Sequence, residues 1–178
     1  MHISPKFLAD LLTLTRVVVA LGILGAAWRG DRSSLPWVVA VTVLAWSGDM
    51  LDGWLAKRGG YSPISWVGRH DHEVDASLAG ATMIYLWRIG LVPGWLLILL
   101  LVGTFLIWLK VRSDWVWMGF NTGSHVVAFT ALLSTFPALA GIAVGWGAMV
   151  LLAGRRRAVR MLHEVRLRMR RLFNPTTQ

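Results

Sequence analysis

The sequence predicts an all-α integral membrane protein with six transmembrane helices and a C-terminal basic amphipathic helix. Hydrophobic residues make up 56% of the 178 residues and charged residues only 15%, whereas soluble domains are about 45–50% apolar and about 25% charged. The 18 Gly and 11 Trp also fit a membrane protein, because membrane helices tolerate Gly and Trp collects at the interface between bilayer and water. This composition excludes a disordered or collagen-like chain. We expect one domain over residues 1–178.

The first three predicted spans cover residues 11–28, 37–56 and 74–91. Each contains a mostly apolar stretch of about the 20 residues that a membrane-spanning helix needs. The first half of the first span carries Asp10, Thr13, Thr15 and Arg16, and these polar residues predict a position at the membrane interface.

The last three predicted spans cover residues 94–109, 122–136 and 138–153. The pair Pro93-Gly94 and the single Pro137 predict tight turns between neighbouring helices. The last two spans share an almost unbroken apolar run, so a single long buried segment is the alternative there. That alternative would place the C-terminus on the other face of the membrane.

A basic amphipathic helix is predicted over residues 153–173. Its apolar residues recur at the three-to-four spacing of a helix face, which suits a helix lying on the inner leaflet. A solvated basic tail that only sets topology is the alternative. Eight of the 18 Lys and Arg residues of the chain lie in this region: Arg155, Arg156, Arg157, Arg160, Arg166, Arg168, Arg170 and Arg171.

The distribution of basic residues predicts the orientation. With six spans, both termini share one side with the basic tail and the loops after residues 56 and 109, and basic loops mark the cytoplasmic side. The opposite loops contain only Arg29, Arg32 and Arg88. We therefore expect a multi-pass protein of the cell (inner) membrane with cytoplasmic termini. The net charge of +9 is explained by contact with membrane lipids, so no nucleic-acid partner is expected.

Acidic residues are concentrated between the second and third spans. Five of the nine lie there: Asp49, Asp52, Asp71, Glu73 and Asp75. At about 1.5 Å per residue, Asp49 and Asp52 lie roughly 8 to 12 Å inside the basic boundary at Lys57. A carboxylate at this depth normally faces a wet cavity or a cation.

Helical spacing groups these acids into two pairs. Asp49, Asp52, Gly53 and Ala56 share one helix face, and the pair Asp71/Asp75 opens the next span. If the two helices are antiparallel neighbours, the pairs converge near the cytoplasmic surface. Four facing carboxylates need cations between them, and hard oxygen ligands suit Mg²⁺, Mn²⁺ or Ca²⁺. Two such ions are a known device for displacement at phosphorus, and the small residues leave a groove for a phosphate-bearing ligand.

The run from Asp49 to Lys57, followed by the run from Gly68 to Asp75, resembles the motif of the CDP-alcohol phosphatidyltransferase family. That motif reads D-x-x-D-G-x-x-A-R, a spacer of about eight residues, and G-x-x-x-D-x-x-x-D. The stretch from Leu11 to Arg16 is similar to the opening segment of the family.

The resemblance implies a cytoplasmic active site in a phosphotransferase of phospholipid biosynthesis. A phosphatidyl or phospho-alcohol group would pass from CDP-diacylglycerol or another CDP-alcohol to an acceptor alcohol, with release of CMP. Asp49, Asp52 and Asp71 would hold two Mg²⁺ or Mn²⁺ ions, and Asp75 would be the catalytic base and a further metal contact. Gly53 and Ala56 would line the nucleotide groove. A homodimer is also implied by the family.

The match to the family motif departs at two places in the nucleotide-binding part. Lys57 stands where the family has Arg, and a Lys lacks the bidentate fork for phosphate. Gly68 lies three rather than four positions before Asp71. Either the loop has an extra residue, or Val67 occupies the position of the Gly.

The acceptor alcohol is left open by the sequence. Lys110 and Arg112, at the end of the fourth span, are candidates for binding an acceptor phosphate, and a purely topological role is the alternative. For the whole protein, the alternatives are an ion-coupled membrane transporter and a catalytically inactive relative of the family.

Overall fold

The computed structural model describes residues 5–58 and 69–153, and the side chains of residues 5, 6, 9, 49–58 and 150–153 lie outside the description. Within these ranges the chain forms α-helices and one short 3-10 helix, without a strand. The helices are α1 (Pro5–Arg29), η1 (Arg32–Ser34), α2 (Leu35–Arg58), α4 (Asp71–Arg88), α5 (Gly94–Val111), α6 (Asp114–Thr135) and α7 (Pro137–Ala153). The predicted all-α class is confirmed for this part of the chain. The predicted helix over 153–173 lies outside it, apart from its first residue.

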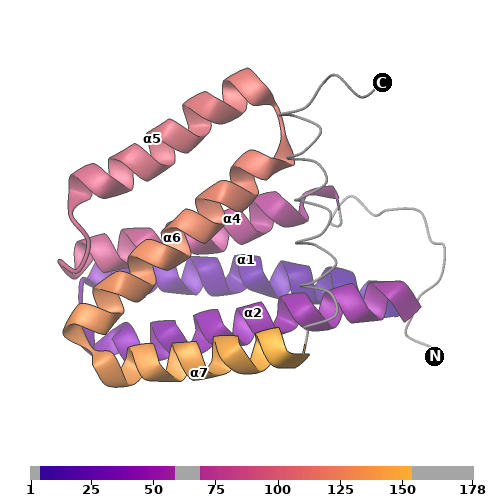
Figure 1. Ribbon diagram of the computed structural model, residues 1–178, viewed down its shortest axis with the longest axis horizontal. Helices are drawn as coiled ribbons and strands as arrows, with labels where there is room; N and C mark the ends of the chain where they lie inside the picture. Colours follow the sequence, from indigo (N-terminus) through magenta and orange to yellow (C-terminus); the bar gives the residue numbers. More distant parts are fainter. Residues whose placement is uncertain (1–4, 59–68, 154–178) are drawn as a thin grey trace, which may run out of the picture. The chain divides into compact units, whose positions relative to one another are not determined.

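The chain divides into two compact units, Met1–Ala143 and Val144–Gln178. The first unit contains α1 to α6 and the beginning of α7. In it, α1 packs most extensively against α4 and α2, and α6 packs against α4 and α5, as Figure 1 shows. Helix α4 therefore contacts α1, α2, α5 and α6, and its most extensive contact is with α1.

Small residues are buried where α4 packs against its neighbours. Ala20, Ala26 and Ala27 of α1 share one core cluster with Ala81 of α4. Ala76 and Ala79 of α4 pack instead with Phe120 of α6, and a Cβ on Gly80 would lie 3.9 Å from the Phe120 ring. Small residues at a contact allow two helix backbones to come near each other, which is how membrane helices gain packing energy. Larger side chains complete the main cluster, among them Ile23, Leu35, Met83 and Tyr85, each no more than 1% exposed.

Helix α1 exposes large apolar side chains and buries two polar ones together with its small and apolar core residues. Its exposed side chains include Leu11, Leu14, Val18, Leu21, Leu24 and Trp28. Thr13 and Arg16 are buried among the helices at 5% and 1% exposure. Burial against other helices does not fix their depth in a membrane, so their predicted position at the interface stays a prediction. Large apolar side chains on an outer face suit contact with lipid.

Two helices in the described ranges are long and apolar enough to cross a membrane, at Asp10–Arg29 and Gly94–Val111. The second has most of its apolar side chains exposed, including Trp95, Ile98 and Leu99, and buries only Leu97. The apolar part of α7, Pro137–Met149, is shorter. Six helices thus correspond to the six predicted segments, while their number of membrane crossings stays a prediction.

Helix α4 ends earlier than predicted, at Arg88 rather than residue 91, because the backbone at Gly90 is left-handed (φ 76°). The Gly90 N–H binds the Trp87 carbonyl at 2.9 Å, and the Leu91 N–H binds the Leu86 carbonyl at 2.9 Å. These two bonds form a Schellman motif, which ends a helix at a glycine.

Helix α6 begins at Asp114, eight residues before the predicted start. Its first two turns start with Asp114 and continue through residues 115–120, which are all apolar, so the apolar run of this helix is longer than predicted. The single long segment proposed as an alternative for residues 122–153 is wrong. Phe136 leaves the helical conformation (φ −137°, ψ 70°) and Pro137 starts a new helix.

The ends of α1 and α4 are tied together by side chains. Arg32 Nε donates to the Ile89 carbonyl at 2.9 Å, and Arg88 Nε donates to the Ala27 carbonyl at 3.4 Å. The buried Tyr85 hydroxyl donates to the Asp31 carbonyl at 2.9 Å. Both Arg side chains therefore satisfy carbonyls that a helix end leaves open.

Candidate active site

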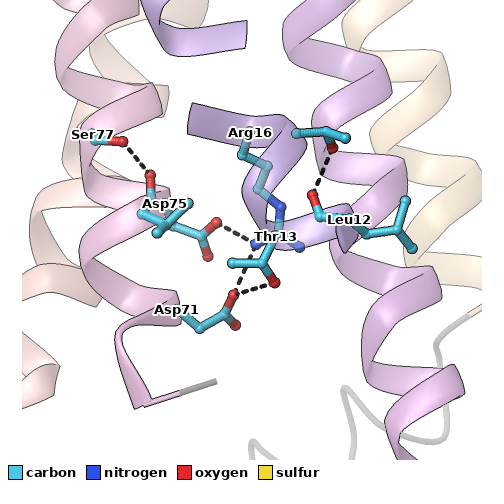
Figure 2. A network of polar contacts seen from close by, with 8 residues as sticks. Leu12, Thr13, Arg16, Asp71, Asp75 and Ser77 are labelled. Atoms are coloured by element: carbon cyan, nitrogen blue, oxygen red, sulfur yellow. Dashed lines mark hydrogen bonds and ion pairs between the residues drawn. The ribbon is translucent and has the colours of Figure 1, made fainter. Parts of the chain in front are cut away.

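Asp71 and Asp75 lie one helical turn apart at the start of α4. The helix begins after His70, whose carbonyl accepts from the Val74 N–H at 3.0 Å. Acids in the first turn of a helix are stabilised by its dipole. The four-residue spacing also turns both carboxylates to the same side, toward α1 (Figure 2).

Arg16 of α1 contacts both carboxylates through a single nitrogen. Its Nη1 atom lies 2.6 Å from Asp75 Oδ1 and 3.2 Å from Asp71 Oδ1. The Arg16 side chain is 1% exposed, whereas Asp71 and Asp75 are 32% and 22% exposed. The cation is therefore buried in the bundle, and the acids lie between it and the outside.

Thr13 adds a neutral contact to the same group. Its hydroxyl donates to Asp71 Oδ1 at 3.2 Å, and Thr13 lies one turn before Arg16 on α1. Figure 2 shows both side chains facing the acid pair. We call Thr13, Arg16, Asp71 and Asp75 the acid–arginine cluster.

One Arg and two carboxylates leave the acid–arginine cluster with one net negative charge. Removing one partner from a buried ion pair costs about 3–5 kcal/mol, because the other charge is left without compensation. Because both acids are partly exposed, the cost of removing Arg16 or one of the acids lies at the low end of that range. The cluster therefore stabilises the contact between α1 and α4 and remains attractive to further cations.

The other two predicted metal ligands lie on α2. Asp49 and Asp52 are in its helical part, which ends at Arg58, so the predicted helical stripe with Gly53 and Ala56 has the required backbone. Their side chains, and that of Lys57, lie outside the described residues, as does Gly68. Whether the acids of α2 and α4 converge stays a prediction.

Helix α6 lies next to α2 just above the predicted stripe. The rings of His125 and Trp46 have their centroids 4.3 Å apart, and Trp46 lies three residues before Asp49 on α2. His125 Nδ1 also pairs with the Asn121 carbonyl of its own helix. His125 thus packs between α6 and α2.

Arg112 has local partners at the end of α5. Its backbone is left-handed (φ 51°) and its N–H donates to the Trp108 carbonyl at 2.8 Å. Its Nε donates to the Leu109 carbonyl at 3.3 Å, and its guanidinium lies 5.2 Å from the centre of a Trp108 ring. These contacts assign Arg112 to ending the helix. Acceptor binding by Lys110 and Arg112 stays a prediction.

The described acids fit a divalent cation by their chemistry. Carboxylate oxygens are the hard ligands that Mg²⁺ and Mn²⁺ prefer, and Asp71 and Asp75 already turn toward one shared positive group. Among the side chains that the structure describes, no three His, Cys, Asp or Glu residues gather into a metal site. A complete site therefore needs the acids of α2 as well.

Sequence reasoning missed the role of Arg16 and Thr13. The available signal was the depth of Arg16, which lies 11 residues after the start of α1 and is followed by an apolar run. A cation inside a membrane helix needs an acidic partner, and the acids of the third predicted span were candidates.

Comparison with known proteins gives one match. The family model described as CDP-alcohol phosphatidyltransferase matches residues 6–154. This range includes nearly all of α1, the whole of α2 to α7, and the four aspartates of the motif, Asp49, Asp52, Asp71 and Asp75. No curated protein and no solved structure matches the chain.

Members of the matched family are membrane-embedded transferases of substituted phosphate groups that act in phospholipid synthesis. They are generally dependent on divalent metals. The match covers most of the sequence and begins before the acid–arginine cluster. The chain belongs to the CDP-alcohol phosphatidyltransferase family.

Proposed function

We propose that this protein transfers a phosphatidyl or phospho-alcohol group from CDP-diacylglycerol or another CDP-alcohol to an acceptor alcohol. The hydroxyl oxygen of the acceptor forms a bond to the alcohol-side phosphorus, and the bond from that phosphorus to CMP breaks. Asp75 takes the proton of the attacking hydroxyl. The observation that carries the proposal is the convergence of Asp71 and Asp75 on one atom of Arg16, because it groups two acids of the family motif.

We further propose that Asp49, Asp52, Asp71 and Asp75 hold two Mg²⁺ or Mn²⁺ ions. Such ions supply charge neutralisation for the diphosphate and for the leaving CMP. Gly53 and Ala56 leave room for the nucleotide along α2, and Lys57 and Gly68 are the candidates for contacts with its phosphates. Lys110 and Arg112 are the candidates for the acceptor side.

The proposed site lies at the cytoplasmic side of a six-span protein with both termini on that side. The exposed apolar surfaces of α1 and α5 support lipid contact for these helices. The homodimer implied by the family is part of the same proposal.

Exchange of labelled CMP into the liponucleotide tests the reaction in reverse, without knowledge of the acceptor: CMP attacks the phosphorus of the product phospholipid and the acceptor alcohol leaves. The purified protein is mixed with CDP-diacylglycerol, a membrane lipid extract that contains candidate products, labelled CMP and Mg²⁺ or Mn²⁺, and label in the liponucleotide is measured. We expect metal-dependent exchange that Asp75→Asn lowers by about 100-fold or more. Asp114→Asn is the matched control, because Asp114 is an exposed acid in the first turn of α6.

Two results would contradict the proposal. One is equal exchange with Asp75→Asn and with the wild type. The other is a lack of exchange with CDP-diacylglycerol and with every other CDP-alcohol tested, from folded protein that binds metal. The second result would indicate an inactive relative or a transporter.

A further inference from the structure

Arg16 is placed where an acid pair needs a cation. Its Nη1 atom contacts one oxygen of each acid, at 2.6 Å on Asp75 and 3.2 Å on Asp71. The side chain that delivers this atom is 1% exposed, so burial keeps it in position.

Two carboxylates on one helix face repel each other, and the repulsion grows as water is excluded. In the described cluster the compensating charge comes from α1, the helix that packs most extensively on α4. Thr13 holds Asp71 from the same helix without adding charge.

We propose that Arg16 is a positioning residue that keeps Asp71 and Asp75 together when no divalent cation is bound. This inference rests on the proposed function for its metal ligands and extends it to the metal-free protein. Arg16 and a divalent cation then have overlapping electrostatic roles. Loss of Arg16 should make the stability of the protein depend on the metal.

The chain supplies a matched control for this inference. Arg88 also joins α4 to α1, but it donates to the Ala27 carbonyl at the other end of the contact. Arg16→Met and Arg88→Met therefore remove the same chemical group from the same pair of helices. Only the first substitution leaves two acids without their arginine.

The test measures the midpoint of thermal unfolding with and without Mn²⁺, in the full chain in detergent or lipid. Without Mn²⁺ we expect Arg16→Met to unfold about 5–10 °C below the wild type. With saturating Mn²⁺ we expect at least half of that difference to disappear. For Arg88→Met, the difference in unfolding midpoint from the wild type should be the same with and without Mn²⁺.

A second measurement does not depend on the metal. Adding Asp75→Asn to Arg16→Met removes one of the two repelling charges, so the double variant should be more stable without Mn²⁺ than Arg16→Met alone. In the wild-type background Asp75→Asn should be destabilising, because it removes a partner of Arg16. If Arg16→Met yields too little folded protein, the yields of the single and double variants give the same comparison.

Two results would overturn the inference. One is a lowering of the unfolding midpoint by Arg16→Met that is equal with and without Mn²⁺. This would mean that Arg16 contributes packing and no charge compensation for the two acids. The other is a double variant no more stable than Arg16→Met. Failure of the proposed function is a separate observation, because it appears as absent CMP exchange in the wild type and leaves these midpoints unaffected.

Discussion

The Nη1 atom of Arg16 lies 2.6 Å from Oδ1 of Asp75, a residue 59 positions later in the chain. This contact joins α1 to α4, the helix that carries the proposed catalytic base. A change in either residue should therefore affect both the packing of α1 on α4 and the chemistry proposed for the acids.

Asp71→Asn tests the assignment of a metal ligand. The amide keeps the size of the side chain but removes the negative charge, so we expect the Mn²⁺ concentration for half-maximal CMP exchange to rise at least about 10-fold. Glu73→Gln is the control, because Glu73 lies in the same helical turn. An unchanged Mn²⁺ requirement in Asp71→Asn would show that Asp71 does not bind the metal.

Gly90→Ala tests the left-handed end of α4. A Cβ at φ 76° costs about 1–2 kcal/mol, which should lower the midpoint of thermal unfolding. Gly103 on α5 is the control, since nothing lies within 4 Å of a Cβ built there, and Ala is favoured over Gly in a helix. Equal midpoints for Gly90→Ala and Gly103→Ala would contradict the Schellman assignment.

The Asp31 carboxylate should make stability depend on acid pH. Hydrogen bonds from the Ser33 hydroxyl and N–H lower the pKa of Asp31 below its ordinary value. A lowered folded-state pKa contributes stability above the unfolded pKa, near 3.9, and that contribution is lost as the pH falls through the folded value. The stability difference between wild type and Asp31→Asn should therefore be present at pH 7 and decrease as the pH falls from about 3.9 through the lowered folded-state pKa. A difference that stays constant over this fall in pH would contradict this role.

Single cysteines test the predicted orientation, because the chain contains no cysteine. Asp114→Cys and Ser33→Cys place a thiol at exposed positions in segments predicted to face opposite sides of the membrane. An impermeant maleimide should label Asp114→Cys in inside-out vesicles and Ser33→Cys in right-side-out vesicles. Labelling of both variants in the same preparation would exclude the predicted topology.

The sequence predicted the helices better than their ends. Apolar runs located all six, because burial in lipid or in a core requires long apolar stretches in either case. The end of α4 depends on the conformation of Gly90, and the start of α6 at Asp114 lies before an apolar run, residues 115–120, that the prediction left outside the span. The break before Pro137 was predicted from the proline itself, which cannot continue a preceding helix.

The acids of the site were predicted from spacing, whereas their arginine was not. Asp71 and Asp75 belong to one helix and are four residues apart, so helical spacing alone predicts that they share a face. Arg16 reaches them across 55 residues of sequence, and no spacing rule connects positions that far apart. Only the packing of α1 on α4 brings the three residues together.

The separation between Arg16 and its acids also bears on biosynthesis. Helix α1 leaves the ribosome with a cation in its apolar run, and the carboxylates that bind this cation in the finished bundle are made 55 and 59 residues later. We therefore expect newly made α1 to be retained by the translocation machinery, and to insert stably into the bilayer only after α4 has been made and has bound it.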